Sequence, residues 1–206
     1  MDYNLVYLLD GKIYINLTNT CTNNCVFCIR SIKDDVVGAN LFLKSENVKA
    51  SEVIEQLKKF EDKISSEIVF CGYGEPMLKL DVLKEVAKYI KENYPQVKVR
   101  VNTNGQANLV YKRNVLPELK GLVDKFSVSL NGENEKVYNA VSIPTIKNSY
   151  QAVKEFIKES AQEGFDTTAT IVTGYKDYKI DMEKCIEITQ ELGAKFRERP
   201  WLNNGY

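Results

Sequence analysis

Short runs of alternating apolar and polar residues recur along the chain, separated by longer stretches with helical spacing. At 97–102 every second residue is valine, and the residues between them are Lys98, Arg100 and Asn102. Because successive side chains of a strand point to opposite faces, this pattern predicts a strand with one apolar and one polar face. Other short β-rich runs predict four more strands, at 67–71, 125–130, 167–172 and 195–199.

The chain opens with two further β-rich runs, at 5–9 and 12–17, on either side of Asp10-Gly11, and the second of them alternates. Asp-Gly is a strong signal for a two-residue turn between antiparallel strands. The pattern therefore predicts an N-terminal β-hairpin, whose second arm leads directly into residues 21–28.

Between the later strands, apolar residues recur at intervals of three and four, which is the spacing of amphipathic helices. The first helix is predicted to begin with Ser51 as its N-cap and to bury Val53 and Leu57. Further helices are predicted at 81–94, 115–119, 149–163 and 181–192.

Strands that alternate with helices predict an α/β fold built of βα units around a parallel sheet. Six parallel strands are too few for the eight of a closed TIM barrel. The polar face of each strand favours a partly open barrel that is lined for a ligand, and an open sheet with one solvated face is the alternative. A length of 206 residues predicts a single domain, 1–206.

Composition narrows the possible partners and location. The 28 basic residues balance 28 acidic ones, and no basic stripe gives a direct sign of nucleic-acid binding. No apolar run approaches the roughly 20 residues of a membrane span. We expect no signal peptide, and with reduced cysteines this predicts a cytoplasmic protein.

The strongest chemical signal is the run Cys21-Thr22-Asn23-Asn24-Cys25-Val26-Phe27-Cys28. Three thiolates at this spacing can bind three irons of a 4Fe–4S cluster, which normally takes four cysteines, and leave one iron open to a small molecule. A structural zinc site needs four ligands, but the chain has no histidine, and Cys71 and Cys185 stand alone. Zinc and cysteines without a metal remain the alternatives.

This loop, with Phe27 just before the last cysteine, resembles the signature of the radical S-adenosylmethionine (SAM) superfamily. The resemblance implies a partial (βα)6 barrel and two cofactors, one 4Fe–4S cluster and SAM bound to the open iron. It further implies an external electron donor such as flavodoxin or ferredoxin, and cleavage of SAM to methionine and a 5′-deoxyadenosyl radical. The runs Cys-Ile-Arg, Phe-Cys-Gly-Tyr-Gly-Glu-Pro and Arg-Glu-Arg-Pro-Trp are similar to those of a small radical SAM group linked to TatD-type nucleases.

Polar residues that follow the strands are candidates for SAM contacts, because active sites of βα barrels lie at the carboxyl ends of strands. The segment 71–76 resembles the Gly-Gly-Glu motif that binds the methionine amino group, with Tyr73 inserted. The resemblance implies that Glu75 is the carboxylate partner, assisted by Gly72 and Gly74. We expect the two glycines to allow close backbone approach and positive φ.

The resemblance implies further SAM contacts from the later strands, at Asn102, Asn104, Ser129, Asn131 and Ile171, and Arg199 is a further candidate because an inward arginine suits a carboxylate. Asn104-Gly105 could instead be a simple turn. Arg197 and Arg199 share a strand face, and the pattern leaves open whether they point inward, to a carboxylate, or outward, to a surface ion pair. Arg30 is a comparable candidate.

Three functions remain open from the sequence. The first is a radical SAM enzyme acting on a small-molecule or peptide substrate, and the second is an activase that installs a glycyl radical on a partner protein. The third is a non-catalytic iron–sulfur or zinc module. Segment 30–44 is predicted to be a lid, unless a peptide covers the side gap of the barrel. Cys71 and Cys185 are predicted to be packing residues.

Overall fold

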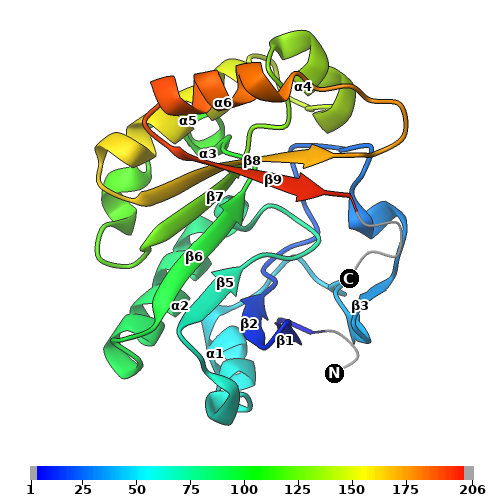
Figure 1. Cartoon of the computed structure of the whole chain (residues 1–206). Helices are drawn as coiled ribbons and strands as arrows, with labels where there is room; N and C mark the ends of the chain where they lie inside the picture. The colour runs from blue at the N-terminus through cyan, green and yellow to red at the C-terminus, as the bar shows by residue number, and fades with distance from the viewer. Residues whose placement is uncertain (1–3, 202–206) are drawn as a thin grey trace.

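The computed structural model describes residues 4–201, and its centre is one seven-stranded sheet in the order β1-β2-β5-β6-β7-β8-β9 (Figure 1). β1 pairs antiparallel with β2, and every later neighbour pairs in parallel. The N-terminal hairpin and the six parallel strands are therefore confirmed. The strands are β1 (Val6–Leu9), β2 (Lys12–Ile15), β5 (Glu67–Phe70), β6 (Lys98–Thr103), β7 (Lys125–Ser129), β8 (Asp166–Thr173) and β9 (Lys195–Pro200).

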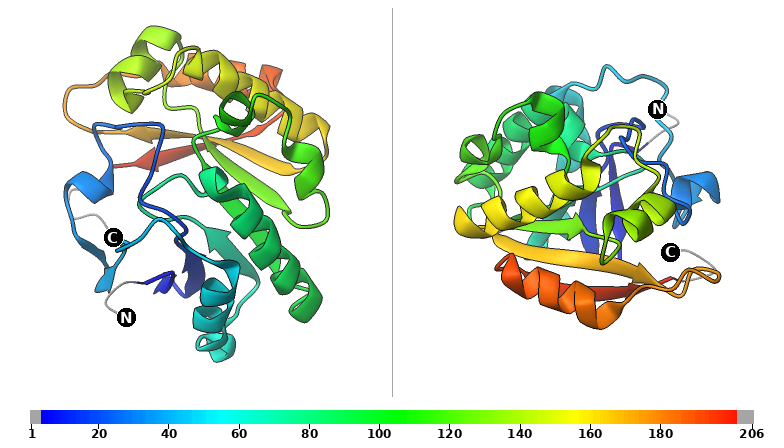
Figure 2. Two further views of the ribbon diagram at one scale, coloured as in Figure 1. Left: turned by 180° about the vertical axis from the view of Figure 1, so that it is seen from behind. Right: turned by 90° about the horizontal axis from the view of Figure 1, so that it is seen from above.

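Helices cover the outer face of the curved sheet, so that the fold is the predicted partial barrel (Figure 2). The α-helices are α1 (Ala50–Lys58), α2 (Leu80–Asn93), α3 (Ala107–Tyr111), α4 (Glu135–Ser142), α5 (Ser149–Gln162) and α6 (Met182–Glu191). The short 3₁₀ helices are η1 (Ile29–Ser31), η2 (Glu61–Lys63), η3 (Pro76–Lys79) and η4 (Leu116–Leu119). The helix predicted at 115–119 is thus a single 3₁₀ turn, and α3 and α4 were not predicted.

The capping residues at the starts of α1 and α4 differ from the sequence prediction. Ser51 is not the N-cap of α1: the N-cap is Lys49, two residues earlier, and the helix begins at Ala50. Glu52 stabilises that start instead, because its carboxylate accepts a hydrogen bond from the Lys49 backbone N–H at 3.0 Å. The start of α4 carried an overlooked signal, since the Asn134 side chain accepts a hydrogen bond from the Val137 N–H at 3.0 Å.

The two faces of the sheet differ as the alternation predicts. On the outer face, apolar strand residues are fully buried under the helices, and Phe126 contacts Phe156 with ring centroids 5.3 Å apart. On the inner face the register pairs Asn102 with Ser127 and Ser129 with Thr170. The inner face of the barrel is therefore polar.

Segment 30–44 folds into a small hairpin of β3 (Asp35–Val36) and β4 (Ala39–Asn40) rather than an irregular loop. A second apolar cluster holds it against β1, separate from the main core. The cluster consists of Tyr7, Leu9, Val36, Leu41 and Tyr73. A lid made from this segment would therefore have to move a packed hairpin.

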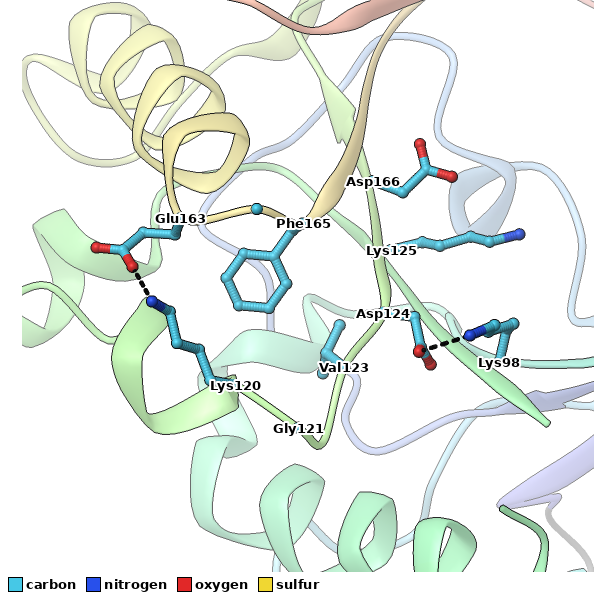
Figure 3. A pocket seen from close by; sticks show the side chains of 10 residues that line it. Lys98, Lys120, Gly121, Val123, Asp124, Lys125, Glu163, Phe165 and Asp166 are labelled. Atoms are coloured by element: carbon cyan, nitrogen blue, oxygen red, sulfur yellow. Dashed lines mark hydrogen bonds and ion pairs between the residues drawn. The ribbon is translucent and has the colours of Figure 1, made fainter. Parts of the chain in front are cut away.

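A cluster of ion pairs lies at the amino end of the barrel. Glu67 is buried and lies between Lys125 at 3.0 Å, Lys12 at 3.3 Å and Arg100 at 3.3 Å. A hollow of about 420 Å³ near this end is lined by amino-terminal residues of β6, β7 and β8 and by the segments before them (Figure 3). Because it lies at the end of the strands opposite the cysteines, it is not the candidate site. Among residues 4–201, no helix has the length and apolar character to cross a membrane.

Candidate functional site

The cysteine loop leaves β2 at the carboxyl end of the parallel strands, where Cys21, Cys25 and Cys28 are half-buried free thiols. Burial and the charge of Glu75 raise the pKa of Cys21 to about 11. Burial and the neighbouring thiols Cys28 and Cys21 raise the pKa of Cys25 to about 12, while a hydrogen bond with Ser142 opposes that rise. The thiols are therefore close enough to repel one another once ionised.

Gly72 and Gly74 let the segment after β5 lie directly against the entry to the cysteine loop. A Cβ at Gly74 would lie 2.4 Å from the Thr18 carbonyl oxygen and 2.5 Å from that of Thr20, and a Cβ at Gly72 would lie 2.0 Å from Asn16 Oδ1. The expected close approach is thus present. Neither glycine has a positive φ, so that part of the expectation is wrong.

Glu75 is buried at this junction and is held by neutral donors. Its Oε1 accepts hydrogen bonds from the Thr103 hydroxyl at 2.8 Å and the Met77 N–H at 3.0 Å, and its Oε2 accepts one from the Asn104 N–H at 2.6 Å. Burial raises the pKa of Glu75 to about 7, although these hydrogen bonds lower it. The carboxyl group is therefore fixed in position, and a nearby cation would stabilise its charged form.

Asn104 joins this carboxylate to the cysteine loop. Its backbone N–H donates to Glu75, and its side-chain Nδ2 donates to Thr22 Oγ1 at 2.8 Å and lies 3.8 Å from Cys21 Sγ. Asn104 is therefore more than the turn residue that its Asn-Gly sequence allows. Asn102 lies on the inner face, and its Oδ1 is buried and accepts no hydrogen bond from the described residues.

Ser129 and Asn131 lie at the carboxyl end of β7. Ser129 is half-buried and paired in register with Thr170 on the inner face. Asn131 has a left-handed backbone, with φ of 57°, and its Nδ2 donates to the Ser142 hydroxyl at 3.2 Å. Its Oδ1 is buried without a partner among residues 4–201, as is Asn102 Oδ1. Both oxygens could accept a hydrogen bond from a ligand.

The candidates on β8 and β9 lie on different faces of the sheet. The Ile171 side chain is fully buried in the main apolar core, on the face of β8 opposite Thr170, so it does not line the polar inner face. Arg197 donates a hydrogen bond to the Ser127 hydroxyl at 2.9 Å and therefore points inward. Arg199 shares this face, and its positive charge acts on the Cys71 thiol.

Arg30, Cys71 and Cys185 are the remaining residues discussed from the sequence. Arg30 is engaged by the loop itself, since its guanidinium donates to the carbonyl oxygens of Asn19 at 2.7 Å and Asn23 at 3.4 Å. Cys71 is half-buried beside Asn102 on the inner face, and its packing role stays a prediction. Cys185 is fully buried in the main core, as predicted.

Aromatic residues that the sequence analysis did not select border the cysteine loop. Phe27 contacts Tyr175 edge-on at 6.0 Å between ring centroids, and Tyr175 contacts Trp201 at 5.1 Å. Tyr175 follows Gly174 at the end of β8, and Trp201 follows β9. An aromatic residue within two positions of the end of each of two neighbouring strands was the available signal.

The inserted Tyr73 points away from the inner face and into the second apolar cluster. Its hydroxyl donates to the Lys33 carbonyl oxygen at 2.7 Å, and its ring contacts Phe42 at 4.8 Å. The glycine segment is thereby tied to the β3–β4 hairpin.

The donor set fits a cubane cluster with an open iron. Three soft thiolates lie in one loop, a chemistry that suits iron–sulfur sites. Within the described residues, no three His, Cys, Asp or Glu side chains converge as ligands of a single metal ion would. The unpaired oxygens of Asn102 and Asn131 offer acceptors to a ligand with amino or hydroxyl groups.

Comparisons with known proteins give a family match and several relatives. A model of the Radical SAM superfamily matches residues 15–188. A protein of Treponema denticola named a probable dual-specificity RNA methyltransferase RlmN is 26% identical over 190 residues, covering 88% of this chain and 51% of its own length. A Prochlorococcus marinus protein of the same name is 27% identical over 154 residues, covering 69% of this chain and 41% of its own. The chain thus spans about half the length of such relatives, or less.

Solved structures share the fold. SuiB of Streptococcus suis, bound to S-adenosylmethionine, superposes with a TM-score of 0.70 at 16% identity, over 98% of this chain and 42% of SuiB. The maturase HydG of Carboxydothermus hydrogenoformans gives a TM-score of 0.63 at 20% identity, over 92% of this chain and 44% of HydG. At these identities the likeness concerns the fold alone.

Proposed function

The chain belongs to the radical SAM superfamily, and on this premise we propose that it is an enzyme that cleaves SAM reductively to act on a small molecule or peptide. The superfamily uses a 4Fe–4S cluster and SAM. When both are bound, the cluster supplies the electron that splits SAM into methionine and a 5′-deoxyadenosyl radical.

In this proposal Cys21, Cys25 and Cys28 ligate three irons of the cluster. The methionine end of SAM is held at the junction of Gly72, Gly74 and Glu75, where a buried carboxylate meets no cation among the described residues. An ammonium group there would stabilise the charged form of Glu75. The other proposed SAM contacts are Phe27, Asn102, Asn104, Ser129, Asn131 and Arg199.

The two contacts of Asn104 support the proposal most directly. Asn104 binds the Glu75 carboxylate through its backbone and the cysteine loop through its side chain, so three separate strands bring their candidate residues to one place. Because a cluster and a ligand on its open iron need thiolates and a polar pocket side by side, this arrangement supports a shared site.

The charge of the inner face favours a substrate that carries a carboxylate. Arg197 and Arg199 give the inner face positive charge, which suits a carboxylate on a small molecule or a peptide. The relatives named RNA methyltransferases make RNA the competing class, although this chain has balanced charge. The chemistry requires an external electron donor, and we expect a cytoplasmic location, where thiols are kept reduced.

Anaerobic reconstitution with iron and sulfide tests the proposal. The wild-type chain should bind about four irons and four sulfides. With SAM and dithionite it should then release 5′-deoxyadenosine, slowly alone and faster with a substrate from a panel of carboxylates, peptides and RNA. A chain that loads its cluster and binds SAM, but forms no 5′-deoxyadenosine with any reductant, would be a binding module instead.

A further inference from the structure

The cysteine loop is bound along one side by the segment that leaves α4. The Val26 N–H donates to the Val141 carbonyl oxygen at 2.9 Å, and the Asn24 N–H donates to that of Ser142 at 3.1 Å. In return Thr145 donates to the Thr22 carbonyl oxygen, through its N–H at 2.8 Å and its hydroxyl at 3.0 Å. The exit segment is thus paired alongside the loop, and Asn23 and Pro144 form an isolated antiparallel β-bridge.

Below the loop, a buried polar group ties the same helix to Asn23. Gln106 Nε2 donates to Asn23 Oδ1 at 2.8 Å and to the Tyr138 hydroxyl oxygen at 2.8 Å, and Asn23 Nδ2 lies 3.4 Å from that hydroxyl. All three side chains are nearly or fully buried. The Asn23 backbone N–H in turn donates to Cys21 Sγ at 3.4 Å. The Tyr138 hydroxyl is therefore two contacts away from a ligating sulfur.

The exit segment also holds a strained residue. Ile143 has a left-handed backbone, with φ of 42°, although it is β-branched and its side chain is exposed. Such a conformation costs about 1–3 kcal/mol and persists only where the surrounding structure requires it. Here the requirement is the turn that brings 141–145 alongside the cysteine loop.

We propose that α4 and its exit segment, residues 138–145, are the positioning element of the cysteine loop, with Tyr138 as the central positioning residue. The proposal rests on the cluster ligation proposed above. Groups outside the ligand set commonly fix the orientation of metal ligands, and their loss weakens metal binding about 10–100-fold. Hydrogen bonds to ligand sulfurs also set the reduction potential of a cluster.

Tyr138→Phe tests the proposal, because it removes one hydroxyl and keeps the ring. The matched control is Tyr150→Phe, since Tyr150 packs on Tyr138 at 5.5 Å between ring centroids but has no hydrogen bond to the cysteine loop among the described contacts. Both reconstituted holoenzymes are mixed with an iron chelator, and the reduced cluster is examined by EPR with and without SAM. Tyr138→Phe should lose iron on the order of tenfold faster and show an altered SAM-dependent spectrum.

The outcomes are distinguishable. Iron loss at the wild-type rate with an unchanged spectrum in Tyr138→Phe overturns the proposal, as does equal impairment in Tyr150→Phe, which would indicate general packing.

Thermal unfolding of the cluster-free variants shows whether they fold. If Tyr138→Phe does not, Thr145→Val decides, because Thr145 is exposed and loses only its hydroxyl bond to Thr22. It should accelerate iron loss, and a wild-type rate there overturns the proposal. Failure of the wild-type chain to load a cluster would instead reject the proposed function.

Discussion

Among residues 4–201, each end of the barrel has one buried glutamate, and the two carboxylates have opposite surroundings. At the amino end, Glu67 lies among Lys12, Arg100 and Lys125, and although burial raises its pKa, the hydrogen bond from Lys125 and the other positive charges hold it below the usual range. At the carboxyl end, Glu75 is held by neutral donors, and burial raises its pKa to about 7. No lysine or arginine pairs with Glu75 in the part of the chain that the structure describes.

The same contrast holds for uncharged groups. Four buried amide oxygens lack a hydrogen-bond donor within residues 4–201, and all lie at or just beyond the carboxyl ends of strands: Asn16, Asn102, Gln106 and Asn131. Unpaired buried polar groups are rare because each costs about 1–3 kcal/mol. These oxygens lie at the carboxyl end, where a ligand could donate hydrogen bonds to them, whereas Arg100 Nε, which is buried without a hydrogen bond, lies 3.3 Å from the Glu67 carboxylate toward the amino end.

The largest expected effect is the loss of the cluster in Cys25→Ala. A cubane held by two thiolates lacks a third protein ligand, so we expect no stable cluster after anaerobic reconstitution. Iron and sulfide analysis measures the result. Cys185→Ala is the control, because Cys185 is buried in the core and should leave cluster content at the wild-type value. A full iron content in Cys25→Ala would refute the ligand assignment.

Next in size is the effect of Glu75→Gln on SAM. The substitution preserves shape but removes the charge that would meet the SAM ammonium group, and a hydrogen bond between charged groups is worth about 1.5–3 kcal/mol. SAM binding, measured by equilibrium dialysis on the loaded protein, should weaken at least about tenfold. Cluster content should stay unchanged. Equal SAM affinity in Glu75→Gln and wild type would remove Glu75 from the SAM site.

Glu67→Gln should have the opposite effect to Glu75→Gln, since it should lower stability and leave SAM binding unchanged. It leaves three cations without their shared carboxylate, so the free energy of unfolding should fall by about 2 kcal/mol. SAM affinity should not change, because Glu67 lies at the far end of the strands. Denaturant unfolding and SAM titration of the same preparation make the comparison. A variant that keeps wild-type stability but binds SAM poorly would reverse the roles assigned to the two ends.

The pH dependence sharpens this contrast. The pKa of Glu67 is lower in the folded state, so its stabilisation is present above the unfolded pKa of about 4.3 and is lost as the pH falls through the folded value. The stability difference between wild type and Glu67→Gln should therefore be constant near neutral pH and shrink below about pH 4. A difference that stays constant on acidification would mean that the ion pairs of Glu67 do not stabilise the fold.

The smallest expected effect concerns the β3–β4 turn. Val37 is 64% exposed and has φ of 51°, followed by Gly38 at 76°. A β-branched residue is strained there, whereas Asn-Gly suits such a two-residue turn. Val37→Asn should raise the unfolding free energy by about 1 kcal/mol without changing cluster content. Thermal unfolding checks this, and a destabilised variant would show that exposed Val37 makes contacts that outweigh its strain.

Much of the fold and part of the site could be read from the residues alone. The alternation at 97–102 gave β6 and its polar face, Asp10-Gly11 gave the hairpin, and the cysteine spacing gave the candidate ligands. These features are local, since the period of a strand, the chemistry of a turn and the spacing of ligands are each contained in a few neighbouring residues. Family resemblance then supplied the partial barrel.

Other features of the site depended on contacts between distant residues. The side chain of Asn104 binds Thr22, which is 82 positions away, and Tyr138 lies beside Asn23 across 115 positions. Whether Arg197 points inward, whether Tyr73 leaves the glycine segment for another cluster, and whether Ile171 joins the core all depend on register and packing. A single-residue shift of a strand would exchange its faces, so no local pattern determines which side chains meet at the carboxyl end.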